Sequence, residues 1–402
     1  MNVLFLTLGR FDSIESYGLY SDLLRQFRDR GHTVYAVSQR EKRTGLPTEV
    51  VKENGAYMLH VKIGNITKCR RIEKGISTIM IESQYLRAIK KYFPGVKFDL
   101  VLYSTPPITL VGVVKYIKKR DGAKAYLLLK DIFPQNAVDI GIMKKSGVKG
   151  LLYRYFRKKE IEIYAVSDYI GCMSPANVDF VLKHNPEVSR EKVGICPNSI
   201  VPRDMSVTAK ERSEMRKKYG IPEDKKVFVY GGNLGKPQGI PFIIECLRCL
   251  KDNDDVYFLI VGDGTEFSKF SEFVEAEKQR NVRLMQRLPK EDYDRMVAAC
   301  DIGLLFLDHR FTIPNFPSRL LAYMQAGLPV LACTDPNTDV GKVIEEGGFG
   351  WWCESNDPEG FHSLVQSIVS TDTKEMSKNA VAYLNENYTA QKAYGYIMNF
   401  LQ

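Results

Sequence analysis

Short apolar runs alternate with amphipathic segments along the first half of the chain. Six of these runs predict β-strands: NVLFLTL, TVYAVS, AYMLHV, DLVLYS, AYLLLK and YIGCMS. Between them, LYSDLLRQFRDRGH and the stretch around IMIESQYLRAIKKYF place apolar residues at helical spacing. Because strands that alternate with helices pair in parallel and are covered on both faces, this half predicts a parallel α/β sheet.

The second half repeats this alternation. Its predicted strands are KVFVYG, VYFLIVG, IGLLFL and LPVLAC, and its helical segments include IPFIIECLRCLKDN and DYDRMVAACD. Because 402 residues are too many for one hydrophobic core, we predict an α/β protein with two Rossmann-like, doubly wound parallel-sheet domains facing a cleft. The polar segment CPNSIVPRDMSV is the expected hinge. A ligand is expected at the carboxyl ends of the strands.

Composition narrows the class of protein. With 44% hydrophobic and 26% charged residues, the chain has the composition of a soluble globular protein. No apolar run approaches the length that spans a bilayer, and the N-terminus lacks a basic-then-apolar signal, so we expect a cytoplasmic protein. The eight cysteines are scattered. We expect Cys246 and Cys249 near the buried face of one helix, as free thiols rather than metal ligands.

Charge is distributed unevenly between the two halves. Residues 1–200 contain 33 Lys and Arg against 19 Asp and Glu, a net charge of +14, whereas the remaining residues contain 24 against 29, or −5. The first half is therefore expected to face something anionic. Its densest basic stretch, residues 142–160, interleaves Leu, Tyr and Phe with Lys and Arg. This pattern is typical of a membrane-surface helix, and equally of a solvated helix face.

A glycine-rich loop follows the first strand of the second half, in KVFVYGGNLGKPQGIPFII. Its glycines permit tight turns and close backbone approach to a ligand, and Lys236 is a mobile cation suited to a phosphate. The glycine spacing matches neither the dinucleotide-binding fingerprint nor the P-loop. The loop is either a phosphate contact or an ordinary strand-to-helix turn.

The segment TIPNFPSRLLAYMQAG, residues 312–327, is a second candidate anion site. Its two prolines fix the path of a loop, after which Ser318 is predicted to cap a short helix that ends at Gly327. A helix start exposes unpaired N–H groups that favour anions, and Arg319 would add a cation there. An ordinary capped helix is the alternative.

Several motifs, taken in order and spacing, resemble the retaining glycosyltransferases of family 4 with the two-domain B-type fold. They are RGHTVYAVS, CPNSIV, YGGNLGKPQGI, FLIVGDGTE, VRLMQRLPKEDYDRMVAACDIGLLFL and FPSRLLAYMQAGLPVLA. DIFPQNAVDIG and IPNFPSR are most similar to the subgroup that adds amino-sugars in bacterial capsule or O-antigen assembly. The resemblance implies an acceptor-binding domain over residues 1–200, joined by a crossover helix over 383–402, and a nucleotide-sugar-binding domain over 201–382.

The resemblance also implies a donor site in the second domain. Two glutamates usual in the family are replaced by Pro314 and Ala322, so sugar contacts are expected from the backbone around Asn315 to Pro317. Lys236 and Arg319 are expected to supply charge for the diphosphate. The remaining donor contacts are expected at Gly232, Asn233, Gly235, Arg287, Leu288, Phe316 and Ser318.

Asp131, in LLLKDIFPQ, is expected at a strand end of the first domain. It is the candidate for contacting or deprotonating the acceptor hydroxyl, or it caps the following turn.

Together these features predict a glycosyltransferase that moves a sugar, with retention, from a nucleotide-diphosphate sugar such as a UDP-sugar. The expected acceptor is a lipid-linked saccharide at the inner face of the cytoplasmic membrane, where the enzyme binds peripherally. No metal, other cofactor or nucleic acid is expected, because the sequence shows no clustered carboxylates at ligand spacing and no aromatic stacking module. The alternatives are a nucleotide-sugar epimerase of related fold and a non-catalytic glycosyltransferase-like partner subunit.

Overall fold

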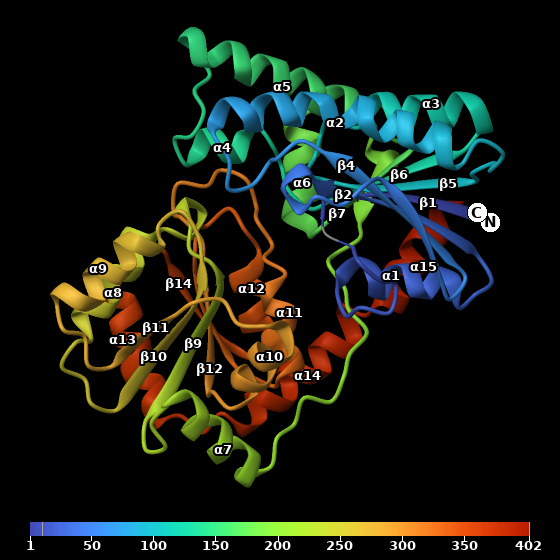
Figure 1. Ribbon diagram of the computed structural model, residues 1–402. Helices are drawn as coiled ribbons and strands as arrows, with labels where there is room; N and C mark the ends of the chain where they lie inside the picture. Colours follow the sequence, from blue (N-terminus) through green and yellow to red (C-terminus); the bar gives the residue numbers. More distant parts are fainter. Residues whose placement is uncertain (10, 402) are drawn as a thin grey trace. The chain divides into compact units, whose positions relative to one another are not determined.

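The chain forms two compact units in a computed structural model that describes residues 1–9 and 11–401 (Figure 1). The first unit contains Met1–Val201 and Thr389–Gln402, and the second contains Pro202–Tyr388. Their boundary lies within the segment CPNSIVPRDMSV. The chain returns to the first unit at Thr389, six residues after the start of the predicted crossover helix. Residue 402 of that predicted helix lies outside the described residues.

The first unit contains an eight-stranded sheet in the order β3-β4-β2-β1-β5-β6-β7-β8. The central strand β1 pairs in parallel on both sides, with Val3 opposite Val34 and Leu100. Of its strands, β3 runs antiparallel to β4. The bounds are β1 Asn2–Leu6, β2 Thr33–Glu41, β3 Glu49–Glu53, β4 Ala56–Ile63, β5 Leu100–Ser104, β6 Lys124–Leu129, β7 Tyr169–Cys172 and β8 Val193–Ile195. All six predicted strands are therefore confirmed.

Helices cover both faces of this sheet. On one face α3 packs against α2 and α5, and on the other α1 packs against α15 (Figure 1). The ring of Tyr394 meets that of Phe27 edge-on, with centroids 4.8 Å apart, which joins the C-terminal helix to the core of this unit. The helices are α1 Leu19–Arg28, α2 Arg71–Tyr92, α3 Val111–Asp121, α4 Gln135–Asp139, α5 Gly147–Val166, α6 Pro175–His184 and α15 Ala390–Leu401, with short 3₁₀ turns η1 Lys42–Thr44 and η2 Arg190–Lys192.

The second unit contains a six-stranded parallel sheet in the order β11-β10-β9-β12-β13-β14. The chain order reverses at β9, which pairs with β10 on one side and β12 on the other. The loops that leave β9 and β12 therefore diverge, which is where open α/β sheets bind ligands. The bounds are β9 Lys226–Asn233, β10 Val256–Asp263, β11 Val282–Met285, β12 Ile302–Phe306, β13 Val330–Thr334 and β14 Gly350–Glu354.

The helices of the second unit enclose a core in which the rings of Phe228 and Phe258 stack, with centroids 5.2 Å apart. They are α7 Ala209–Tyr219, α8 Ile240–Cys249, α9 Phe267–Ala276, α10 Lys290–Ala298, α11 Arg319–Gln325, α12 Val340–Glu346, α13 Pro358–Ser370 and α14 Lys374–Asn387, with a 3₁₀ turn η3 Lys236–Gln238. None of the helices in the described residues is long and apolar enough to cross a membrane.

The cysteines are all free thiols, as predicted. One detail of the prediction is wrong: Cys246 is buried, but Cys249 is exposed. Cys249 is the last residue of α8, and it lies outside the helix face that carries the buried Cys246, Leu247 and Leu250.

Candidate active site

A pocket of about 520 Å³ opens at the carboxyl ends of β9 and β10, within the second unit. It is lined by Gly231, Gly232, Asn233, Val261, Gly262, Asp263, Arg287, Leu288, Pro289, Lys290, Tyr293, Asp294 and Ala322. These residues come from the ends of two strands, the loop after β11, and the helices α10 and α11. The pocket therefore lies where a doubly wound sheet is expected to bind its ligand.

Glycines let the backbone approach closely on the floor of this pocket. A Cβ added to Gly262 would collide with the carbonyl oxygen of Gly232 on the neighbouring strand. Gly232 itself has a φ of 138°, and a Cβ there would collide with the guanidinium of Arg319. These two positions therefore require glycine, because only glycine combines this backbone geometry with the available space.

Arg319 lies behind the glycine loop. Its guanidinium carbon is 4.1 Å from the centre of the Tyr230 ring, a cation–π contact. Burial disfavours its charge, but interactions with Tyr230, Tyr323 and Tyr293 leave its pKa raised. Within residues 1–9 and 11–401, no carboxylate lies at ion-pair distance from this side chain. A persistent positive charge thus stands directly behind Gly232, although Arg319 does not itself line the pocket.

The glycine loop is held by Gln238. Its Oε1 accepts hydrogen bonds from Asn233 Nδ2 at 2.9 Å and from the Gly235 backbone N–H at 3.2 Å. Lys236 is exposed at the start of η3 and, like Gly235, is not part of the pocket lining. The sequence placed Lys236 and Arg319 together on the diphosphate. The structure puts them in different settings, Lys236 in solvent and Arg319 partly buried against Tyr230.

The loop before α11 differs from its prediction. Ser318 occupies the position before the helix, but it already has helical angles, φ −62° and ψ −16°, and makes no side-chain capping bond. The prediction that Ser318 caps the helix is wrong, because a residue in the helical conformation cannot turn its side chain back onto the first turn. The predicted end of the helix is confirmed, since Gly327 has a φ of 63°.

The neighbouring residues predicted to contact the sugar are not part of the pocket lining. The carbonyl of Asn315 accepts a hydrogen bond from Thr338 Oγ1 at 2.5 Å, while the Asn315 Nδ2 is buried without a partner in the described part of the chain. Phe316 is buried, and its ring centre is 5.8 Å from that of Tyr388. Pro317 accepts the Leu320 N–H at 3.2 Å.

Several residues of the lining were not predicted. Lys290 Nζ lies 2.8 Å from Asp294 Oδ2 across one turn of α10. In a sequence, a lysine and an aspartate four residues apart are typical of an ordinary exposed ion pair on a helix. The spacing therefore gave no sign that these two residues line a pocket. Asp263 also belongs to the lining. Its position directly at the end of β10 was the signal for a ligand-facing side chain.

Asp131 lies in the first unit, two residues after β6. Its carboxylate accepts two hydrogen bonds from Asn136 Nδ2, at 2.7 and 2.9 Å. Burial raises the pKa of Asp131 to about 6, against the effect of Asn136. A carboxylate with such a pKa is suited to accept a proton near neutral pH. Its side-chain bonds hold the first turn of α4, so the capping alternative also describes its contacts.

Next to Asp131, Lys130 donates from Nζ to the carbonyl oxygen of Cys196 at 3.1 Å. Burial lowers the pKa of this ammonium group. The backbone N–H groups of Lys130 and Asp131 both donate to Thr105 Oγ1, at 3.0 and 3.1 Å. The strand end is therefore fixed by three hydrogen bonds to residues distant in the sequence, and these bonds hold the backbone at Asp131 in place.

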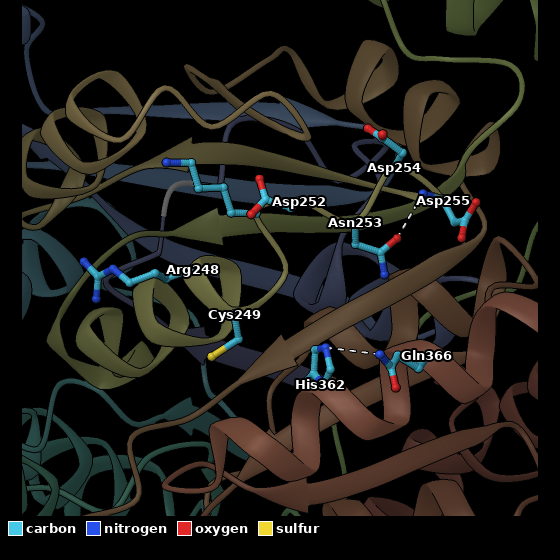
Figure 2. A pocket seen from close by; sticks show the side chains of 9 residues that line it. Arg248, Cys249, Asp252, Asn253, Asp254, Asp255, His362 and Gln366 are labelled. Carbon is cyan, nitrogen blue, oxygen red and sulfur yellow. Dashed lines mark hydrogen bonds between the residues drawn. The ribbon is translucent and has the colours of Figure 1, made fainter.

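A second pocket, of about 430 Å³, lies at the opposite end of the same sheet (Figure 2). It is formed by the segment from Arg248 to Asp255, which leads into β10, together with His362 and Gln366 of α13. Because the amino ends of parallel strands are not where such sheets bind substrates, we do not assign it to the active site. Over the described residues, no group of three or more His, Cys, Asp or Glu side chains is placed to hold a metal ion.

Most of the second unit matches a known protein family. Residues 211–385 match the family model described as "Glycosyl transferases group 1". The chain is 27% identical over 330 residues to "Probable glycosyltransferase WbjE" of Pseudomonas aeruginosa, covering 82% of this chain and 80% of that protein. It is 24% identical over 292 residues to the Escherichia coli K12 protein named "Putative colanic acid biosynthesis glycosyl transferase WcaI", covering 70% and 69%.

A solved structure confirms the predicted fold. Anabaena HepE, determined in complex with UDP, superimposes with a TM-score of 0.68 at 15% identity, covering 100% of this chain and 99% of HepE. At this identity the likeness shows the fold alone. Taken with the family match, it confirms the prediction of two parallel-sheet α/β units of the B type. Residues 211–385 therefore match the glycosyl transferase group 1 family, and the chain is a glycosyltransferase.

Proposed function

We propose that this protein transfers a sugar from a UDP-sugar to a lipid-linked saccharide during assembly of a bacterial surface polysaccharide. The observation that carries the proposal is the pocket at the ends of β9 and β10, inside the glycosyl transferase domain. The name of WcaI refers to colanic acid biosynthesis, and HepE was solved with UDP, which supports the polysaccharide and the nucleotide.

In this proposal the nucleotide lies in the pocket and is contacted by two parts of its lining. The loop containing Arg287 and Leu288 contacts the base, and the backbone of Gly232 and Asn233 faces the diphosphate. The partly buried charge of Arg319 then stabilises the negative charge that grows on the departing diphosphate, because a preorganised cation shielded from water acts strongly there. Lys236 adds a second charge from the loop surface.

The finer parts of the proposal concern the sugar and the acceptor. The transferred sugar is an N-acetylated amino-sugar held near the backbone of Asn315, Phe316 and Pro317, and its anomeric configuration is retained. Asp131 contacts or deprotonates the acceptor hydroxyl. The reaction proceeds without a divalent metal ion, at the inner face of the cytoplasmic membrane. Activity that persists in excess EDTA tests whether the reaction is independent of a metal ion. An NMR spectrum of the product tests whether the anomeric configuration is retained.

The decisive experiment incubates the purified protein with UDP-sugars, with and without a lipid-linked saccharide. We expect UDP release that requires the acceptor. A rearranged sugar nucleotide formed from donor alone would instead identify an epimerase.

A non-catalytic partner subunit is the second candidate function. It is favoured by Pro314 and Ala322, which replace acidic residues usual in the family, and Ala322 does line the pocket. Such a subunit would show no UDP release with any donor and no thermal stabilisation by UDP. Stabilisation by UDP, together with acceptor-dependent release, contradicts this alternative.

A further inference from the structure

The first half of α2 exposes a row of large apolar side chains. Ile72 is 80% exposed and Ile79 65% exposed, and Ile76 and Met80 are exposed beside them. Their spacing of four, three and one residues places them on one face of the helix. Ser77, Ile81 and Tyr85 are buried on the opposite face. This part of α2 is therefore apolar towards solvent as well as towards the core, which is unusual for a surface helix.

The first half of α5 has the same character. Leu151 and Leu152 are 59% and 53% exposed, and Tyr155, one turn further on, is exposed as well. Ile142 precedes this helix and is also exposed. Of the sixteen large hydrophobic side chains that are exposed in the described part of the chain, nine lie in residues 72–80 and 142–161. Their concentration in two segments indicates an interaction surface.

These two segments belong to one face of the first unit. The intervening helix α3 packs against both α2 and α5. Glu82, directly after the exposed row on α2, acts electrostatically on Lys159 of α5. In Figure 1 the two helices run along the same side of the sheet, and both begin at its left. Their exposed first halves therefore form one surface, which we call the α2–α5 surface, defined by residues 72–80 and 142–161.

The charges around the α2–α5 surface are almost all positive. Residues 68–80 contain four basic residues and one acidic, and residues 142–160 contain seven basic and one acidic. The exposed basic side chains include Lys68, Arg70, Lys74, Lys144, Lys145, Arg154 and Lys158. The two acidic residues, Glu73 and Glu160, accept hydrogen bonds from Asn65 at 2.7 Å and from Arg157 at 2.7 Å. The surface is thus apolar at its centre and cationic around it.

We propose that the α2–α5 surface is the membrane-docking face of this protein, and that its partner is a bilayer containing anionic phospholipids. Isoleucine, leucine and tyrosine side chains enter the region between headgroups and acyl chains, while lysine and arginine contact the headgroup phosphates. The net charge of +14 over residues 1–200 attracts the whole unit to such a surface. A protein partner would not require this excess of one charge. The inference deepens the proposed lipid-linked acceptor and rests on it for its biological role.

Flotation with lipid vesicles tests the inference. The full-length protein is expected to float with vesicles of phosphatidylcholine and phosphatidylglycerol, and to stay behind with phosphatidylcholine alone or in high salt. A variant with Ile76→Ser, Ile79→Ser, Leu151→Ser and Leu152→Ser is expected to bind the anionic vesicles at least about tenfold more weakly than the wild type. A matched control, Leu46→Ser with Val51→Ser, removes exposed apolar side chains elsewhere on the same unit and should bind like the wild type.

Several results would overturn the inference. They are unchanged flotation of the four-site variant, equal loss in the control, and equal binding to neutral and anionic vesicles. A dimer that the four-site variant dissociates, without vesicle binding by either protein, would assign the surface to a second copy instead. Vesicle binding is measured without donor, and transfer is measured with a water-soluble acceptor analogue. Failure of docking and failure of sugar transfer are therefore distinguishable.

Discussion

Each unit carries an aspartate, just beyond an interior strand of its sheet, whose carboxyl pKa is raised by burial to about 6: Asp131 after β6 and Asp335 after β13. The difference lies in access. Asp131 remains partly exposed, whereas Asp335 has no exposed surface and its Oδ1 accepts the Asn337 N–H at 2.9 Å. A raised pKa alone therefore does not mark a catalytic group. It must coincide with a route for the substrate to reach the carboxylate.

The largest expected effect separates these two aspartates. Asp131→Asn should lower kcat/KM by about 10²- to 10⁴-fold, because an amide cannot accept the acceptor's proton. Asp335→Asn should leave the rate close to the wild-type value, since no substrate reaches a fully buried side chain. Initial rates of UDP release with a lipid-linked acceptor make the comparison. Equal losses in the two variants would remove the distinction between the two strand ends.

The pH profile gives an independent control on this comparison. If Asp131 accepts the proton, the wild-type rate should fall below a pH of about 6, as the carboxylate becomes protonated. Asp335 has a similarly raised pKa, so Asp335→Asn must retain this acidic limb. If the acidic limb disappeared in Asp335→Asn, the titrating group would be Asp335 in the second unit. That result would contradict the proposed role of Asp131.

The next effect concerns the leaving group. Arg319→Met keeps an apolar contact with Tyr230 but removes the charge behind Gly232, and kcat should fall about 10²-fold. Thermal stabilisation by UDP should shrink in the same variant. Asp131→Asn, in the other unit, should keep full stabilisation by UDP. Calorimetric titration of both variants with UDP distinguishes the donor side from the acceptor side, and unchanged affinity in Arg319→Met would reject its role.

A third comparison tests the close approach of strands beneath the pocket. Gly262→Ala should cost about 3 kcal/mol of unfolding free energy, because its Cβ would collide with the backbone of Gly232. Gly395→Ala is the matched control, since Gly395 lies inside α15 with no atom near an added Cβ. That change should stabilise the protein by about 1 kcal/mol. Urea unfolding measures both, and a harmless Gly262→Ala would show that the strands can separate.

Continuous apolar runs were enough to predict the buried strands, but not the exposed or short ones. The strand β3, EVVKE, is largely exposed, and β8 has only three residues, so neither gives a clear apolar signal. In the site, the sequence pointed to Gly232, Asn233, Arg287 and Leu288, which line the pocket. Whether they bind a nucleotide stays a prediction.

Other features of the site depend on tertiary packing and left no trace in the sequence. The contact of Arg319 with Tyr230 joins residues 89 positions apart, and no local pattern specifies it. The failure of Ser318 as a cap has the same origin, because the surrounding loop rather than the residue type decides its backbone angles. Residue chemistry thus indicated which groups are available, while the fold decided which of them meet.

The smallest expected effect uses Asp335 to test whether burial, rather than a specific contact, raises the two carboxyl pKa values. The folded-state pKa of about 6 lies above the ordinary value of 3.8, so the native protein binds this proton more tightly than the unfolded chain. Stability should therefore fall as pH rises from about 4 to 6, and the cost should persist at neutral pH. Asp335→Asn removes the charge and should stabilise the protein at pH 7 by on the order of 1 to 2 kcal/mol, with no gain below about pH 4. Urea unfolding of both proteins across this range measures the difference. A gain that does not depend on pH would mean that packing, and not the buried charge, distinguishes Asp335 from Asp131.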